Sequence, residues 1–176
     1  MSLATQPSNP NFLSSIGFQF QIERLPNVNW HVTRANIPGM SLNRTDVQTP
    51  FRRFNAGADK LEYEDLSVSF KVAEDLSNWA EVHDWMVGIG FPNNFNQRRL
   101  LEEQGEARVG RGLRTDGTLI VLNSARVPIM ELTFVDLIPN NLTPLEFNTQ
   151  ASIVEYVEAT VTFDFQEYRA RMLKNR

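Results

Sequence analysis

The sequence contains no cysteine and only two histidines among its 176 residues. The absence of cysteine excludes disulfides, thiol catalysis and cysteine-ligated zinc, and it suits assembly in a reducing cytoplasm. His31 and His83 have no sequence neighbours at the spacing of metal ligands, and His83 lies beside an apolar helical stripe. We therefore interpret both histidines as structural residues and expect neither a metal site nor a cofactor.

A long apolar run and an N-terminal leader are also missing. No apolar run approaches the roughly 20 residues that a helix needs to span a membrane. The first residues, "MSLATQPSNPNF", contain neither the basic region nor the apolar region of a secretory signal. We expect a soluble, unexported chain without a membrane partner.

A basic surface is missing as well, because 17 Lys and Arg residues stand against 21 Asp and Glu residues, for a net charge of −4. Binding of nucleic acid requires clustered Lys and Arg side chains, so we do not expect nucleic-acid binding to be the main function of the surface. Two basic patches remain, at residues 52–60 and 98–114, and Glu102, Glu103 and Glu106 dilute the second. Mixed charges of this kind predict contacts between copies of the chain, with simple loop flexibility as the alternative for the second patch.

Catalytic motifs are absent from the most clearly patterned stretch, residues 66–86, which contains no glycine-rich phosphate loop and no nucleophile elbow. Acidic residues flank its strand, and a carboxylate pair for glycoside hydrolysis is conceivable among them. Clusters at strand ends are more often solvated turns and helix caps. We therefore predict that the protein is not an enzyme. The acidic residues are Glu62, Glu64, Asp65, Glu74 and Asp75.

Large apolar residues are abundant, with 41% hydrophobic residues, twelve Phe and three Trp, so a substantial core is expected. At this length we predict a single domain over residues 1–176, with an N-terminal arm at 1–11 and a long inserted loop at 93–116. The arm is small, polar and proline-containing, and the loop has no clear hydrophobic period.

Hydrophobic periodicity predicts mainly β-structure with one helix. Strands without regularly interleaved helices indicate an antiparallel β-sandwich or small barrel, and the helix would flank it. In the first part of the chain we expect a hairpin of strands 16–23 and 28–35, a sharp corner at 37–40, an edge strand at 46–54 and a loop at 55–65. A strand at 66–72 should lead into a helix that starts at about residue 75 and stops at Gly88 and Gly90, before Pro92. Strands at 117–123 and 129–137, a turn at 138–147 and a long last strand at 153–166 should follow.

Two of these strands have one polar face and one apolar face. On the strand at 66–72, Ser67 and Ser69 alternate with apolar residues, and the last strand repeats this polarity with Glu158, Thr160, Thr162 and Asp164. Such a face is ordinarily exposed to solvent, and it would equally suit a sheet that lines an aqueous channel. Periodicity alone leaves both interpretations open.

The order of these motifs resembles a known family. Residues 11–42, 49–92 and 130–165 contain a Phe-rich strand, a strand leading to a Pro-Gly step, the stretch "AGADKLEYEDLSVSF", a helix opened by an acidic residue, and "DLIPNNL" before the final strand. This set is similar to the tail tube proteins of contractile-tailed, T-even-type bacteriophages. The resemblance implies a fold shared with contractile bacteriocin tubes and with the haemolysin-coregulated protein of type VI secretion. It also implies hexameric rings with one continuous inner β-barrel, stacked into a hollow tube inside a contractile sheath.

The resemblance implies partners and positions for the candidate residues. The partners are other copies of the chain, the tail sheath protein, and baseplate and neck proteins, while the tape measure protein and genomic DNA would pass through the lumen without specific binding. The expected place is the virion tail, assembled in the host bacterial cytoplasm. A cap or initiator at the baseplate or neck end, or a non-viral injection tube, is the alternative. Expected lumen-facing residues are Ser67, Ser69, Glu158, Thr160, Thr162 and Asp164; expected contacts between subunits or rings are Phe51, Arg52, Arg53, Asp59, Lys60, Arg98, Arg99, Arg108, Arg111 and Arg114.

Overall fold

The computed structural model describes residues 11–43, 45–48, 50–56, 60–90, 96, 99, 112–150 and 156–173, with the side chains of 45–47 and 53–56 excepted. Its helices are α1 (Pro26–His31) and α2 (Ser77–Gly90), and its strands are β1 (Phe18–Ile22), β2 (Val32–Ala35), β3 (Met40–Leu42), β4 (Thr45–Gln48), β5 (Arg53–Ala56), β6 (Leu61–Tyr63), β7 (Leu66–Lys71), β8 (Thr115–Leu122), β9 (Pro128–Leu142), β10 (Glu158–Asp164) and β11 (Glu167–Met172).

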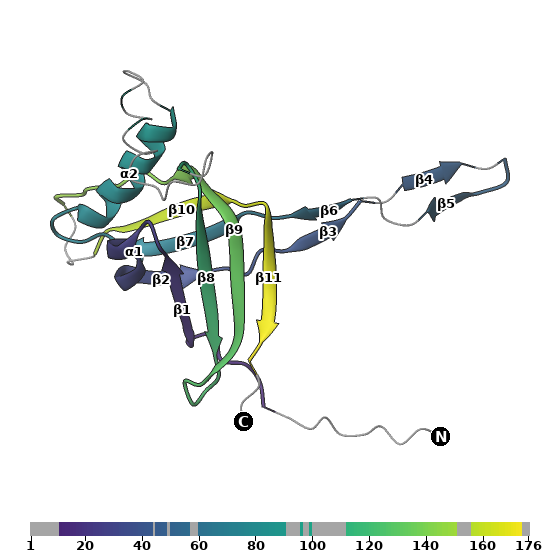
Figure 1. The fold of residues 1–176 in the computed structure, drawn as a ribbon, viewed down its shortest axis with the longest axis horizontal. Coiled ribbons are helices and arrows are strands. Elements are labelled where there is room, and N and C mark those ends of the chain that lie inside the picture. The colour runs from purple at the N-terminus through teal and green to yellow at the C-terminus, as the bar shows by residue number, and fades with distance from the viewer. Residues whose placement is uncertain are drawn as a thin grey trace.

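A seven-stranded antiparallel sheet forms the body, in the order β1-β8-β9-β10-β7-β2, with β11 on the remaining side of β9. The 15-residue strand β9 belongs to both halves, because its first part pairs with β8 and β11 and its last part pairs with β10. We call β1, β8, β11 and the first part of β9 the first half-sheet, and β2, β7, β10 and the last part of β9 the second half-sheet. The strands of the two halves run in clearly different directions (Figure 1). The predicted mainly antiparallel β-fold with a flanking helix is therefore confirmed.

The core lies between the half-sheets and the two helices. Alternation along β7 buries Leu66, Val68 and Phe70 on one side of the strand. Val82 and Trp85 of α2 are equally buried and belong to the same cluster. Each large apolar side chain that is fully buried contributes roughly 1.5–3 kcal/mol, so this shared apolar layer holds the helices on the sheet.

The predicted hairpin of residues 16–23 and 28–35 is wrong. Residues 26–31 form α1 instead, and β1 pairs with β8 while β2 pairs with β7. Pro26 at the first helical position has its φ preset for a helix. The Asn29 side chain then fixes the turn, since its amide bonds both the backbone N–H and the carbonyl of Ile22 at 2.9 Å.

The segment between β2 and β7 also differs from the prediction. The expected edge strand at 46–54 is a hairpin of β4 and β5, and the expected loop at 55–65 contains β6, which pairs with β3. Residues 36–39 interrupt the strand pairing without reversing the chain, so the sharp corner is wrong as well (Figure 1). Strands β3 to β6 form two successive two-stranded pairs that project from the body, and we call them the ribbon.

The predicted passage from strand to helix is confirmed, although α2 begins at Ser77 rather than at about residue 75. Asp75 accepts hydrogen bonds from the Ser77 backbone N–H at 3.1 Å and from its hydroxyl at 2.8 Å. The bond from the Ser77 backbone, followed by that from its hydroxyl, lowers the pKa of Asp75 from its ordinary value of 3.8. Buried Asn78, which the sequence did not single out, accepts from the Ala73 N–H and donates to the Lys71 carbonyl, so it ties the end of the strand to the helix.

The remaining expectations concern the C-terminal half and the long loop. The turn expected at 138–147 is wrong at its start, because β9 continues to Leu142. The last strand expected at 153–166 corresponds to β10 at Glu158–Asp164, and residues 153–155 lie outside the described part. A further strand, β11, follows the bend at Gln166 and was not predicted. Most of the predicted arm at 1–11 and of the predicted loop at 93–116 also lies outside it, although Thr115 and Asp116 belong to β8.

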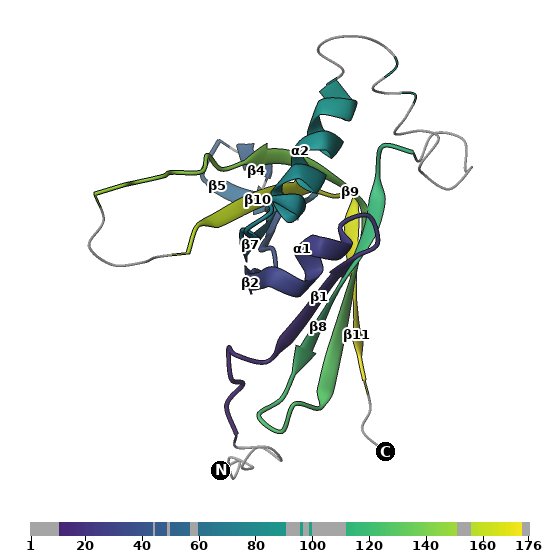
Figure 2. The ribbon, with the colours of Figure 1, turned by 90° about the vertical axis from the view of Figure 1, so that its left-hand side faces the viewer.

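The segment that enters β8 is attached to α2. The indole Nε1 of Trp85 donates to the Leu113 carbonyl at 3.0 Å, and Arg24 Nη1 donates to the Gly112 carbonyl at 2.7 Å. The Arg24 guanidinium also lies over the Trp85 ring, 5.3 Å from its centroid. These contacts join α2 and the segment after β1 to the residues that lead into β8 (Figure 2).

Candidate functional site

The candidate site is one face of the second half-sheet. In the register of β7 and β10, Ser69 lies opposite Thr160 and Ser67 lies opposite Thr162. The Ser69 and Thr160 hydroxyl oxygens are 2.9 Å apart and hydrogen-bonded. Together with Glu158 and Asp164 at the two ends of β10, these side chains share one face, which we call the polar face. The reverse side of the same strands is the buried core.

Three residues join this face that the sequence analysis did not assign to it. Lys71 lies opposite Glu158, and Arg34 lies opposite Ser69 beside an irregularity in β2. Thr33 donates to the Glu158 carboxylate and to the Ser69 carbonyl. Lys71 follows the same alternation as Ser67 and Ser69, so the sequence could have placed it on this face. It could not have placed Thr33 and Arg34 there, because the strand at 28–35 was expected to pair with the strand at 16–23.

Charge on the polar face is balanced. Two basic residues, Arg34 and Lys71, stand against two acidic ones, Glu158 and Asp164. Between them lie hydroxyl groups, and at the β9 end Asn140 donates to Asp164 at 2.9 Å. The face therefore presents equal numbers of acidic and basic side chains and small hydrogen-bonding groups, without a concentrated field of either sign.

The outer strands of the second half-sheet have unused edges. Among the described residues, no strand pairs with the outer side of β2 or with the outer side of 138–142 in β9. Strands β9, β10, β7 and β2 alternate in direction, so the two outer strands run antiparallel to each other. A second copy placed edge to edge would thus present β9 to β2 in the antiparallel sense, which extends the ladder without a break.

The expected contact residues are not gathered in one place. Phe51, 97% exposed, and Arg52 lie between β4 and β5 of the ribbon, and exposed Lys60 precedes β6. Arg53 is in β5, with only its backbone described, whereas exposed Arg114 directly precedes β8 on the body and Arg99 is an exposed helical residue. The others, Asp59, Arg98, Arg108 and Arg111, lie outside the described residues.

The histidines have ordinary surroundings. His31 Nδ1 is 2.9 Å from the Asn27 carbonyl, and the His83 ring stacks on Trp79 with 4.9 Å between centroids. Within the described ranges, no group of three His, Asp or Glu side chains is arranged to hold a metal ion.

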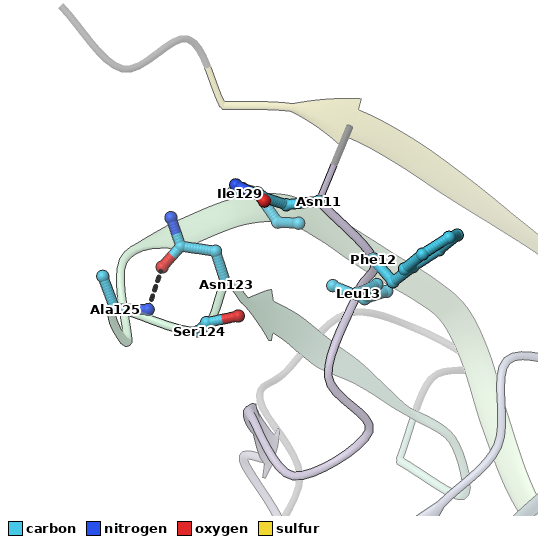
Figure 3. A pocket seen from close by; sticks show the side chains of 7 residues that line it. All are labelled: Asn11, Phe12, Leu13, Asn123, Ser124, Ala125 and Ile129. Carbon is cyan, nitrogen blue, oxygen red and sulfur yellow. Dashed lines mark hydrogen bonds between the residues drawn. The ribbon is translucent and has the colours of Figure 1, made fainter. Parts of the chain in front are cut away.

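A hollow of about 430 Å³ lies at the end of the first half-sheet, between the N-terminal segment and the β8–β9 turn (Figure 3). Asn123 uses its side-chain oxygen to accept from the N–H groups of Ala125 and Val127, both at 2.9 Å, and so shapes the turn. None of the lining side chains titrates, which gives the hollow no acid, base or charged ligand group. The lining residues are Asn11, Phe12, Leu13, Asn123, Ser124, Ala125 and Ile129.

A search for membrane spans finds no helix in the described segments that is both long and apolar enough to cross a bilayer.

Comparison with solved structures identifies similar folds at low sequence identity, whereas no family model and no curated protein matches the sequence. A chain in the structure of the anti-feeding prophage cap, described as the tube-terminating cap, has a TM-score of 0.66 at 10% identity over 98% of this chain and 100% of that chain. A chain of the anti-feeding prophage baseplate has a TM-score of 0.61 at 13% identity, covering 94% and 97%. A chain of the PVC sheath–tube complex, from an extracellular contractile injection system, has a TM-score of 0.55 at 11% identity, covering 98% and 100%.

Proposed function

We propose that this chain is a tube-like structural subunit of a contractile injection system. The observation that carries the proposal is the second half-sheet. It combines a charge-balanced polar face with two outer edges of opposite direction that no described strand pairs with. The similar folds support it, since they come from a baseplate, a tube-terminating cap and a sheath–tube complex. Its role is structural, with no catalytic step.

Edge pairing provides the route to a ring. Unpaired strand edges invite further strands, and cyclic association uses them all up through backbone hydrogen bonds. When β2 of each copy pairs with β9 of the next, the second half-sheets join into one inner barrel with the core and helices outside. The ring number of six comes from the resemblance to tail tube proteins.

The polar face would then line the channel. Each unpaired Lys or Arg in a channel would add affinity for phosphate groups and slow the passage of nucleic acid. On the polar face the acidic residues Glu158 and Asp164 offset the basic residues Lys71 and Arg34 in number. The groups between them are hydroxyls. A tape measure protein and genomic DNA could therefore pass without specific binding, which is the finer form of the proposal: the inner tail tube of a contractile phage, assembled in the host cytoplasm.

Contacts outside the channel are part of the same proposal. Sheath, baseplate and neck proteins would meet the outer surface and the ends of the tube. The exposed residues of the ribbon, Phe51, Arg52 and Lys60, and exposed Arg114 would contact neighbouring subunits or rings.

A cap or initiator at one end of the tube is the second candidate, favoured by the TM-score of 0.66 to a tube-terminating cap. A non-viral injection tube is compatible with the same geometry. Copy number per particle separates a bulk tube protein from a cap, since only the former is present in many stacked rings.

Electron microscopy of the tag-free protein tests the proposal. Negatively stained samples over a range of concentrations are expected to contain rings or hollow tubes. A protein that stays monomeric at every concentration would contradict self-assembly into rings.

A further inference from the structure

The short helix α1 carries an exposed tryptophan that the fold of a single copy does not use. Its helical neighbours have contacts of their own, since Val28 is buried in the core and the Asn29 amide bonds Ile22. Trp30, in contrast, is 88% accessible. Tryptophan is enriched among the few residues that carry most of the binding energy at protein interfaces. Its exposure here therefore indicates a contact with a partner.

Trp30 lies next to one outer edge of the second half-sheet. It precedes β2 by two residues, and no described strand pairs with the outer side of β2. Figure 1 shows α1 at the end of β2 that is opposite to the ribbon. The helix contacts α2 and β7, and its Val28 belongs to the core, so α1 lies on the core side of the half-sheet. In the proposed ring this side faces away from the channel.

The other outer strand of the half-sheet ends in a group of incompletely covered apolar residues. After β9 ends at Leu142, Thr143 continues the pairing, because its N–H donates to the Thr160 carbonyl at 2.9 Å. Leu142 and Leu145 pack against the core but are only partly buried, and Phe147 is 74% exposed. We call Leu142, Leu145 and Phe147 the apolar edge. The core is thus incompletely covered on this side of the chain.

The register places Trp30 and the apolar edge at the same end of the half-sheet. Val32 of β2 and Ala159 of β10 lie opposite Phe70, one on each side of β7. Thr160, which bonds the residue after β9, directly follows Ala159. Because β2 and β9 run antiparallel, β2 begins at the end where β9 finishes. Pairing of β2 with β9 of the next copy therefore brings Trp30 beside the apolar edge of that copy, on the core side of both.

We propose that Trp30 of each copy packs on the apolar edge of the next copy in the same ring and covers the open side of its core. The inference rests on the proposed function and adds to it the side chain that accompanies the strand pairing. β2 has only four residues and an irregular pairing with β7, so its outer edge provides few backbone hydrogen bonds. Such bonds also form in more than one register, whereas an indole that fits one place selects a single register.

Disulfide crosslinking tests the location of the contact, because the chain has no cysteine of its own. His31→Cys and Glu146→Cys, combined in one variant, place thiols beside Trp30 and beside Phe147 at two exposed positions. Oxidation of the assembled variant should give a ladder of covalent multimers that ends at the number of copies in one ring. Phe12→Cys combined with Glu146→Cys is the control and should give no such ladder, since Phe12 lies at the end of the first half-sheet.

Trp30→Ala tests the energetic role of the contact. The variant should fold as the wild type does, as judged by circular dichroism, because the side chain is exposed in the single copy. The protein concentration at which half of the chains are in rings should rise by about tenfold or more, measured by mass photometry over a dilution series. Phe12→Ala, which removes an equally exposed aromatic ring elsewhere, should leave this concentration unchanged. Phe147→Ala should raise it, and should add little to Trp30→Ala because both remove the same contact.

The possible outcomes separate this inference from the proposed function. Rings of Trp30→Ala that form at the wild-type concentration would overturn the inference and leave the proposed function standing, as would rings that give no ladder from the paired thiols. An equal effect of Phe12→Ala would overturn it as well. Wild-type protein that forms no rings at any concentration would instead refute the proposed function, and this inference with it.

Discussion

At the scale of single residues, three asparagines connect elements that apolar packing alone would leave loosely joined. Asn29 bonds both backbone groups of Ile22, Asn36 bonds the Ser67 N–H and the Asp65 carbonyl, and Asn78 bonds the Ala73 N–H and the Lys71 carbonyl. A primary amide suits this role because it carries a donor and an acceptor on one planar group. Hydrophobic periodicity carries no information about such polar contacts, so the sequence analysis did not identify these three asparagines.

Asn78 provides the clearest energetic test, because it is fully buried. Asn78→Ala leaves the Ala73 N–H and the Lys71 carbonyl without their partner, so the free energy of unfolding should fall by about 1–3 kcal/mol. Urea denaturation at fixed protein concentration measures the change. Asp84→Ala, at an exposed position of the same helix, serves as the control and should stay within about 0.5 kcal/mol. Equal effects of the two variants would contradict the assigned role of Asn78.

Asp75 predicts a pH dependence at the same joint. Its pKa is lower in the folded chain than its ordinary value of 3.8, chiefly because the Ser77 backbone N–H donates to the carboxylate. The carboxylate therefore stabilises the fold at pH values above 3.8, and this contribution is lost as the pH falls through the lower folded pKa. Asp75→Ala should be less stable than wild type near neutral pH, and the difference should shrink in acid. A carboxyl ¹³C titration giving a pKa above 3.8 would contradict this.

At the scale of elements, local patterning predicts what local forces determine. The period-two alternation of β7 and the period of α2 are readable because each element buries one face against the same core. Periodicity did not predict α1, because this helix is only six residues long and the alternating Val28 and Trp30 resemble a strand. In the structure only Val28 is buried, while Trp30 is 88% exposed. Strand partners such as β1 with β8 depend on contacts distant in sequence, which no local pattern contains.

Trp30 of α1 and Trp85 of α2 turn this difference into a prediction. Trp85 is 1% exposed and anchors α2 on the core, so Trp85→Ala should reduce the free energy of unfolding by about 3–5 kcal/mol. Trp30→Ala removes an exposed side chain and should cost less than about 0.5 kcal/mol. Chemical denaturation followed by far-UV circular dichroism compares them on the same scale. A larger loss for Trp30→Ala than for Trp85→Ala would show that α1 and α2 pack differently.

At the scale of the whole molecule, the sequence predicted the polarity of the candidate site better than its extent. Alternation alone identified Ser67, Ser69, Thr160 and Thr162, which the structure brings together on one face. It missed Arg34 and Thr33, because their place depends on the pairing of β2 with β7. Alternation could not predict the two edges that no described strand pairs with either, because they too depend on which strands pair. The ribbon was also missed, since neither of its strand pairs has a core of its own to impose a hydrophobic period.

The central claim is that the second half-sheet forms the wall of a channel when copies of the chain join edge to edge. A cryo-EM reconstruction of the tag-free, self-assembled protein at side-chain resolution tests it most directly. The account predicts closed rings in which β2 of each copy pairs with β9 of the next, and in which Ser67, Ser69, Thr160 and Thr162 face the lumen. Rings that carry this face on their outer surface, or that close through other strands, would contradict it.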